Sequence, residues 1–360
     1  MKNKHMKNNS TIINFANIPT WKLLLLIFIY LVFLFIIWQA LLPLKAEWHY
    51  REGYNYDAMR NYSMATKKLK KAIAAAPWET HYEVNLGRAY ENLANAQKDT
   101  NEKLKYLKLA EKHYSNIVNI SPQNPWYHNR LAEIYRQYSK LEDAPNKKME
   151  YFEKYKKTIA RSANLDKNNP LFNMSLGYLY HSEGNYAEAK KIYQRVLEID
   201  FAFSEAYFNL ADIYKREGNK AKVKEIYQKL VETMPHKLGG GEFKNGYLSL
   251  GRVYFEEGNI PSATVMFEKE YELQPRNKTV LMSLAAAYQS AGKWYKLIKI
   301  YHKLLLLDPN DANVRRYLGY TYYRIGKFTD AREELEISLE LEPGNAEAIK
   351  NLNIIKKYVK

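Results

Sequence analysis

The sequence of 360 residues lacks cysteine, which excludes a disulfide framework, a thiolate zinc site and a cysteine nucleophile. Its eight histidines include no pair four residues apart, so the helical metal site of zincin-type proteases is missing as well. The stretch GYLSLG around Ser249 is similar to a nucleophile elbow but is one residue too long. We therefore expect no catalytic residue, no metal site and no cofactor.

Acidic residues are scarce relative to basic ones. The chain has 39 Asp and Glu against 55 Lys and Arg, which leaves a formal net charge of +16. Such an excess suits contact with nucleic acid or with an anionic membrane surface. Tyrosine, in contrast, is abundant, and several of the 32 tyrosines recur at a fixed spacing along the chain.

A long apolar run lies near the N-terminus. Residues 23–42 read LLLLIFIYLVFLFIIWQALL and carry no charge. Twenty helical residues span roughly 30 Å, the thickness of a bilayer core, and Trp21 and Trp38 lie near the two ends, as interfacial aromatics do. A cleaved signal peptide is the alternative, although its apolar stretch is usually shorter and followed by small residues. We predict a basic tail at residues 1–20 and a retained transmembrane helix at residues 21–43.

The basic residues that flank this run predict its orientation. The positive-inside rule counts lysine and arginine on each side of a span and places the richer side in the cytoplasm. Four lysines precede the run and three basic residues follow it closely, namely Lys2, Lys4, Lys7 and Lys22 against Lys45, Arg51 and Arg60. We therefore expect a single-pass protein with its tail in the cytoplasm and its body outside.

A unit of 34 residues can be laid down eight times from residue 46 onward. Its eighth residue is always glycine or alanine, its eleventh is always tyrosine, and its seventh is leucine in every unit but the first. Residues four apart are neighbours on one helix face, so this tyrosine is expected to pack between helices with its hydroxyl at a polar edge. The units begin at Ala46, Thr80, Pro125, Pro170, Ser204, Lys244, Lys278 and Ala312, and their tyrosines are Tyr56, Tyr90, Tyr135, Tyr180, Tyr214, Tyr254, Tyr288 and Tyr322.

This spacing closely resembles the tetratricopeptide repeat (TPR), whose period is 34 residues. The resemblance covers about 300 residues and implies that each unit forms two antiparallel helices, A and B. It implies an all-α fold, a right-handed α-solenoid of eight TPR helix pairs with a C-terminal capping helix, preceded here by one N-terminal transmembrane helix.

The repeat pattern also divides the chain. Units 2 and 3 each run to 45 residues, and their polar, helix-friendly additions predict longer A and B helices. The stretch LGGGEF holds three glycines and is either a hinge or a longer loop. Residues 43–45 alone separate the transmembrane helix from the first unit. We predict units 1–5 at residues 46–237, a Gly-rich joint at 238–243, units 6–8 at 244–345, and a capping helix at 346–360 in which Ile349, Leu352 and Ile355 cover unit 8.

Repeat solenoids of this kind present a concave groove, which the A helices line. The resemblance places groove positions at the second, fifth, sixth, ninth, twelfth and thirteenth residue of each unit. Apolar and aromatic side chains with flexible methionine suit a bound peptide or helix, although several of them have packing against neighbouring helices as the alternative. The predicted groove residues are Met174, Tyr178, Phe208, Asn209, Leu248, Phe255, Met282, Arg316, Tyr317, Tyr320, Tyr323 and Arg324.

Charged residues lead to further expectations. Groove positions of units 2 and 3 carry mixed signs, whereas a nucleic-acid track is a continuous basic stripe. The carboxylate clamp of some TPR proteins is matched here only by Asn85 and Arg130. Four lysines on helix B of unit 1 either contact anionic head groups or form an ordinary solvated face, and we predict the former for Lys67, Lys68, Lys70 and Lys71.

By resemblance, the chain looks like a bacterial single-pass protein of the inner (cytoplasmic) membrane with a periplasmic TPR body. Its expected function is that of a scaffold or adaptor that binds protein partners in the groove and helps assemble a membrane-associated complex. A periplasmic chaperone that binds transient clients and a nucleic-acid-binding helical repeat are the alternatives. Because repeats, span and cap account for the whole chain, we expect no enzymatic activity, no small-molecule substrate and no nucleic-acid partner.

Overall fold

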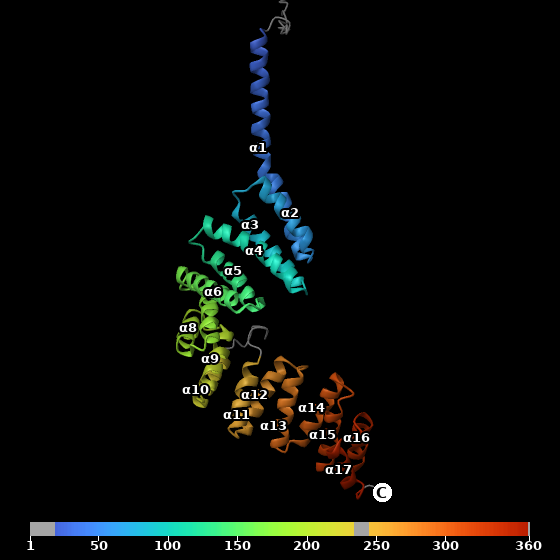
Figure 1. The fold of residues 1–360 in the computed structure, drawn as a ribbon. Coiled ribbons are helices and arrows are strands. Elements are labelled where there is room, and N and C mark those ends of the chain that lie inside the picture. The colour runs from blue at the N-terminus through green and yellow to red at the C-terminus, as the bar shows by residue number, and fades with distance from the viewer. Residues whose placement is uncertain (1–18, 234–244, 359–360) are drawn as a thin grey trace, which may run out of the picture. The chain divides into compact units, whose positions relative to one another are not determined.

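The computed structural model describes residues 19–233 and 245–358, and every regular element in these ranges is an α-helix. Eight helix pairs follow one another and a single helix ends the chain, so the predicted all-α repeat fold is confirmed (Figure 1). The Gly-rich joint at 238–243 lies outside the described residues. The helices are α1 Thr20–Ala58, α2 Tyr62–Ala75, α3 Thr80–Ala96, α4 Thr100–Ile120, α5 Pro125–Leu141, α6 Pro145–Leu165, α7 Pro170–Ser182, α8 Tyr186–Ile199, α9 Ser204–Arg216, α10 Lys220–Thr233, α11 Gly246–Glu256, α12 Ile260–Leu273, α13 Lys278–Ser290, α14 Trp294–Leu307, α15 Ala312–Arg324, α16 Phe328–Leu341 and α17 Ala346–Ile355.

The chain divides into two compact bodies between Asp166 and Lys167. The N-terminal body contains α1 to α6, and the C-terminal body contains α7 to α17. Within each body, every helix packs on the helices that precede and follow it in the chain, which is the contact pattern of stacked helical repeats.

Helix α1 is a single helix of 39 residues that serves two roles. Its first half is apolar and exposed, with a mean hydropathy of 2.8, and it is long enough to cross a membrane. Its second half buries Ala46, His49 and Gly53. Residues 43–45, expected to separate the span from the first repeat, instead continue the helix, and Pro43 lies inside it. A proline costs the helix one backbone hydrogen bond but does not end it here.

The extended repeats have longer helices, as predicted. In α3 and α5 the A helices have 17 residues, against 13 in α7 and α9, and in α4 and α6 the B helices have 21, against 14 in α8 and α10. The additions are therefore four and seven residues, close to one and two helical turns. Additions of whole turns keep the same face of each helix toward its neighbour.

Small residues at the eighth repeat position make close helix packing possible. A Cβ atom on Gly251 would lie 2.5 Å from Cε1 of Phe267, and one on Gly87 would lie 2.8 Å from Cε1 of Tyr114. The repeat tyrosine packs as expected: Tyr90 and Tyr288 are buried, and the Tyr288 hydroxyl donates to Glu268 over 2.6 Å. The eighth repeat position must therefore hold a small residue for steric reasons, and the recurrent tyrosine at the eleventh position is a packing residue.

Helix α17 covers the last pair with a different set of residues from that predicted. Leu352 and Ile355 are buried against Ala331 and Leu335 of α16, as expected. Ile349, however, is 42% exposed, and Ala348 occupies the buried position instead. Residues 348, 352 and 355 are spaced four and three apart, so they lie on one face of the helix, and residue 349 lies next to this face and not on it.

Candidate partner-binding groove

Three hollows lie along the A helices of the C-terminal body. Their volumes are about 510 Å³ for the first, about 350 Å³ for the central and about 550 Å³ for the third. Arg252 and Thr279 line both the first and the central hollow, and Phe255 and Ala286 line both the central and the third. The three hollows therefore adjoin one another, and together we call them the groove.

Exposed faces of α11 and α13 build most of the groove. Spacings of three and four residues put each set of lining residues on one helix face, at the repeat positions that the TPR resemblance assigns to a groove. Phe208 comes from α9, Trp294 from α14 and Arg324 from α15. The set before and on α11 is Asn245, Leu248, Ser249, Arg252, Phe255 and Glu256, and the set on α13 is Thr279, Met282, Ser283, Ala286, Gln289 and Ser290.

The central hollow is mainly apolar, although polar and charged side chains, among them Arg252 and Glu256, also line it. Its lining includes Phe267, which is buried in the core, and Phe255, whose ring centroid lies 6.5 Å from that of Phe267. Met282 is 37% exposed and lines the same hollow with the small side chain of Ala286. An apolar side chain of a ligand would find aromatic and thioether contacts here, with room left by the alanine.

Two arginines line the groove without an acidic partner among the described residues. Arg252 lies between the first and central hollows, and Arg324 lines the third. The Arg324 guanidinium lies 4.5 Å from the centroid of the Trp294 ring and donates a hydrogen bond to the Tyr320 hydroxyl over 3.1 Å. Stacking and hydrogen bonding leave this cation positioned to bind a carboxylate.

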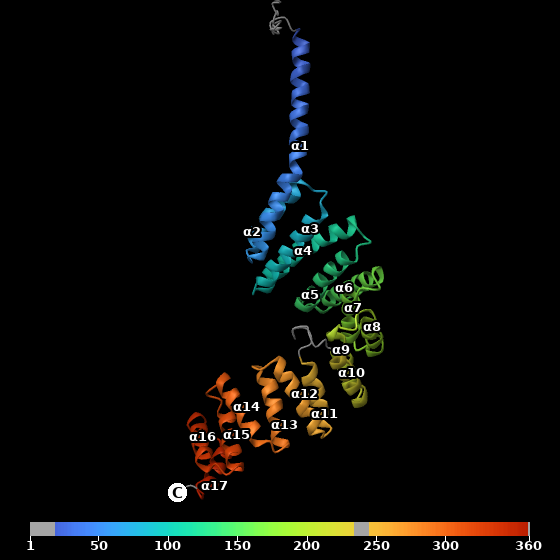
Figure 2. The same ribbon diagram turned by 180° about the vertical axis from the view of Figure 1, so that it is seen from behind.

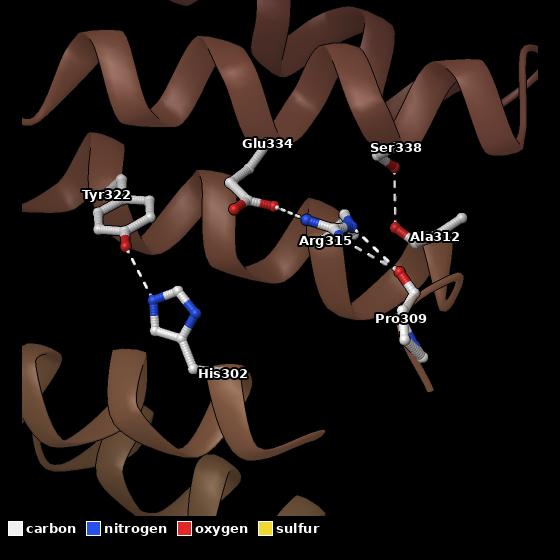
Figure 3. A network of polar contacts seen from close by, with 7 residues as sticks. All are labelled: His302, Pro309, Ala312, Arg315, Tyr322, Glu334 and Ser338. Atoms are coloured by element: carbon white, nitrogen blue, oxygen red, sulfur yellow. Dashed lines mark hydrogen bonds and ion pairs between the residues drawn. The ribbon is translucent and has the colours of Figure 1, made fainter. Parts of the chain in front are cut away.

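A polar network on the opposite side of α15 holds this helix in place (Figure 3). Arg315 donates to Glu334 of α16 over 2.9 Å and to the Pro309 carbonyl, and Ser338 donates to the Ala312 carbonyl over 2.8 Å. The Tyr322 hydroxyl lies 3.0 Å from Nε2 of His302. Because α14 and α16 both contact α15 through these groups, the helix that carries Arg324 is fixed on both sides.

The tetratricopeptide repeat family matches the sequence twice, at residues 180–237 and 280–315. Both matches fall in the C-terminal body, and the second spans most of the groove face of α13. The chain is a tetratricopeptide repeat protein. No curated protein matches it over its sequence.

Solved TPR proteins are similar to this chain at low sequence identity, and one of them has a TM-score above 0.5. The C-terminal part of a TPR repeat-containing protein from Cytophaga hutchinsonii has a TM-score of 0.54 and 18% identity, over 74% of this chain and 99% of that one. YrrB, a TPR protein described as having an unusual peptide-binding site, has a TM-score of 0.45 and 16% identity, over 53% and 96%. A thermophilic TPR protein from Thermus thermophilus has a TM-score of 0.41 and 16% identity, over 58% and 99%.

Five of the twelve groove residues predicted from the sequence of this TPR protein line the groove, namely Phe208, Leu248, Phe255, Met282 and Arg324. Met174 does not, because it is buried in the core of the C-terminal body, at 3% exposure. Leu248 is also buried, so it offers the groove only an edge of its side chain. Tyr178 is exposed and lies edge-on to Tyr193, while Asn209 donates to the Glu205 carbonyl of its own helix.

Of the remaining predicted residues, Arg316, Tyr320 and Tyr323 belong to the contact between α15 and the C-terminal segment of the TPR body. Tyr317 stacks on Tyr301 of α14, with ring centroids 6.1 Å apart. Arg316 stacks on Tyr317, 4.4 Å from its ring centroid, and pairs with Glu347 of α17. Tyr323 lies near Phe328 and Tyr358, with ring centroids 6.0 and 6.2 Å away. Tyr320 and Tyr323 line a separate cavity of about 50 Å³ with residues of α17. The capping helix therefore takes up most of this face.

Sequence reasoning missed Arg252, Ala286 and Trp294. Arg252 and Ala286 stand at the ninth position of their repeats, which the TPR pattern assigns to the groove, but they were not selected among the predicted groove residues. Trp294 begins a B helix, and no groove position is assigned there. In the described residues no group of three or more His, Asp and Glu side chains could hold a metal ion.

The matching face of the N-terminal TPR body is occupied by internal pairs. Arg88 pairs with Asp57 at 3.3 Å, and Asn92 donates to the same carboxylate over 2.9 Å. Glu91 is buried and accepts from Tyr114 over 3.2 Å and from Gln137 over 3.3 Å. Burial raises the pKa of the Glu91 carboxyl above its usual value, although Arg130 opposes this.

The four lysines predicted to face the membrane have different environments. Lys68 is bound to Glu52 over 2.8 Å and lies 5.4 Å from the Trp48 ring centroid. Lys70 is exposed and lies 5.5 Å from the Tyr90 ring centroid. Lys67 and Lys71 are exposed, and neither has an ion pair among the described residues.

Proposed function

We propose that this TPR protein is a membrane-anchored scaffold that holds a segment of a protein partner in its groove and helps assemble a membrane-associated complex. One observation carries the proposal: three hollows, joined through shared side chains, run across α9, α11, α13 and α15. A row of joined hollows fits an elongated segment with several side chains to place, as in groove recognition of peptides and helices.

The lining chemistry defines the segment. An apolar side chain would occupy the central hollow beside Phe255 and Met282. Carboxylates on either side of it would meet Arg252 and Arg324, since charge-assisted hydrogen bonds to arginine are strong and directional. We therefore expect a partner segment with a central leucine or phenylalanine flanked by acidic residues.

An array of 12-residue peptides tests this. Its members carry a central leucine, phenylalanine or serine and flanking aspartate, serine or lysine, and they are probed with the detergent-solubilised full chain. We expect binding of apolar-centred, acidic-flanked peptides. Weak binding of many unrelated apolar peptides would instead favour the chaperone function, and binding of none would contradict both.

A substitution that fills the central hollow tests whether the peptide binds there, and the same substitution elsewhere serves as its control. Ala286→Phe should lower affinity for the bound peptides about tenfold or more, equivalent to about 1.4 kcal/mol, by occupying the apolar anchor position. Ala221→Phe, an equally exposed alanine on the B helix α10, should leave affinity unchanged. Equal affinities of the two variants would show that the peptide binds elsewhere.

The anchor part of the proposal rests on α1. Its first half offers an unbroken apolar surface to the surroundings, which a soluble protein would not leave bare. We propose a single-pass span in the inner membrane with the TPR body outside the cytoplasm. Protease treatment of spheroplasts should remove a C-terminal epitope; an epitope protected until detergent is added would place the body in the cytoplasm instead.

A further inference from the structure

Exposed apolar side chains on α1 continue past the proposed span. Leu41 and Leu44 are 52% and 67% exposed, and Trp48 is 58% exposed although it lies in the repeat-forming half of the helix. Spacings of three and four place these residues on one side of α1. Because the helix is unbroken from Thr20 to Ala58, this side continues directly from the span into the first repeat.

The helix geometry sets the depth of Trp48. A helix rises 1.5 Å per residue, so the five residues after Pro43 carry the backbone roughly 7 to 8 Å beyond the end of the span. The head-group layer on each side of a bilayer core is about 5 to 7 Å thick. The Trp48 backbone would therefore lie at the outer edge of the head-group layer. Side chains on a helix tilt toward its N-terminus, here toward the span, so the ring would reach into that layer, where tryptophan is enriched in membrane proteins.

A second exposed tryptophan lies at the same level on another element. Trp78, which is 58% exposed, stands in the turn between α2 and α3. The residue two before it, Ala76, is in one buried cluster with Ala46 of α1, and the Tyr82 hydroxyl donates to Glu47 over 3.4 Å. Figures 1 and 2 both show this turn beside the point where the exposed half of α1 meets the packed helices.

The charges nearby suit an anionic surface. Helix α2 folds back along α1, so its C-terminal end points toward the span, and Lys67 and Lys71 on it are exposed and unpaired among the described residues. Of the acidic groups at this end, Glu47 is paired with Arg51 at 2.8 Å, whereas Glu79 lies 3.3 Å from His81, which is a cation only when protonated. Two free lysines against one carboxylate without a permanent cation still leave a net positive surface here.

We propose that the first repeat rests on the lipid surface of the membrane that α1 crosses. Trp48 and Trp78 lie in the head-group layer, Lys71 reaches lipid phosphates, and Lys67, farther along α2, acts on them through its electric field. This inference rests on the anchor proposed above. It narrows the predicted set of four lysines to two, since Lys68 is paired with Glu52 and the Lys70 ammonium lies over the Tyr90 ring of α3. Two tryptophans on separate elements restrict both the depth and the tilt of the first repeat.

Tryptophan quenching in vesicles tests the contact. Full-length variants retain one of the six tryptophans, with phenylalanine at the other five. They are reconstituted in phosphatidylcholine and phosphatidylglycerol vesicles whose acyl chains are brominated near the head-group end. Trp48 and Trp78 should be quenched at least about twofold more than Trp126, a control of 46% exposure on α5, and should emit at shorter wavelength.

The outcomes separate the two proposals. If the chain does not float with vesicles and Trp38 is not quenched, the anchor itself is wrong. If Trp38 is quenched but Trp78 emits like the Trp126 control, the anchor stands and the surface contact is overturned. The pair K67E/K71E should reduce Trp78 quenching about twofold in anionic vesicles only, whereas K147E/K148E on α6 should not, and equal effects would remove the lysines from the contact.

Discussion

The two bodies use the same repeat positions for different chemistry. Arg88 in the N-terminal body and Arg252 in the C-terminal body are both the ninth residue of their repeats. Arg88 pairs with Asp57 and lies 5.6 Å from the Tyr54 ring centroid, whereas Arg252 lies between two hollows without an ion pair among the described residues. The fold requires only the packing positions, so the A-helix face is free to be closed by internal pairs or left open for a partner.

Helix length distinguishes the bodies as well. Helices α3 to α6 gain one or two turns over the regular pairs, and side chains on them pair across repeats, as Gln137 does with Glu91. The C-terminal body has short helices and a groove of adjoining hollows. We infer that the N-terminal body, which carries the proposed anchor, is built for support and the C-terminal body for recognition.

The largest expected effect concerns a residue that is both core and groove. Phe267→Ala should lower the free energy of unfolding by about 3–5 kcal/mol, because the ring is buried and fills the space beside Gly251. Tyr193→Ala, an equally buried ring in the same body, should cost a similar amount. Denaturant unfolding followed by circular dichroism measures both.

Peptide binding then distinguishes these two variants. At a temperature where both are folded, Phe267→Ala should lose affinity for acidic, apolar-centred peptides, whereas Tyr193→Ala should retain it. Equal losses would mean that the central hollow is not the anchor position, and that binding only follows the stability of the body.

The second effect compares the two arginines directly. Arg88→Ala should cost about 1–3 kcal/mol of unfolding free energy, because the largely buried Asp57 carboxylate loses its cation. Arg252→Ala should change stability by less than about 0.5 kcal/mol, as an exposed residue without a partner in the described part of the chain, but should weaken binding of acidic peptides. If Arg252→Ala lowered stability and Arg88→Ala weakened peptide binding instead, the assignment of support to the N-terminal body and of recognition to the C-terminal body would be wrong.

The repeat register was predictable because its positions have strict steric requirements. Gly87 and Gly251 accept no side chain without moving a buried ring, so the small residue recurs visibly in the sequence. Exposure was not predictable from register alone. Met174 and Met282 are both the fifth residue of their repeats, yet Met174 is 3% exposed and Met282 is 37% exposed. Which methionine reaches the groove depends on the packing of neighbouring repeats, and the spacing of residues within one repeat does not reveal it.

The continuity of α1 was missed for a related reason. A single proline suggests a break in a helix, but a helix held by packing on α2 tolerates the proline.

The smallest effect uses two glutamates that both accept a hydrogen bond from a tyrosine. Burial raises the pKa of Glu91 in the N-terminal body, whereas the hydrogen bond from Tyr288 is the main cause that lowers the pKa of Glu268 in the C-terminal body. Glu91 therefore favours the folded state in its protonated form, and its contribution to stability is lost as pH rises above about 4.5 through its raised pKa. Glu268 favours folding when ionised, and its contribution is present above about pH 4.5 and lost as pH falls through its lowered pKa.

Substitution by glutamine should therefore give opposite pH dependences. Above about pH 4.5, Glu91→Gln should gain stability relative to the wild type as pH rises, because the wild type alone must ionise a buried carboxyl. Below about pH 4.5, Glu268→Gln should lose stability relative to the wild type as pH rises, because the wild-type carboxyl ionises there. Urea unfolding at several pH values measures both differences. A common sign for the two variants would show that burial does not distinguish the Glu91 carboxyl from the Glu268 carboxyl electrostatically.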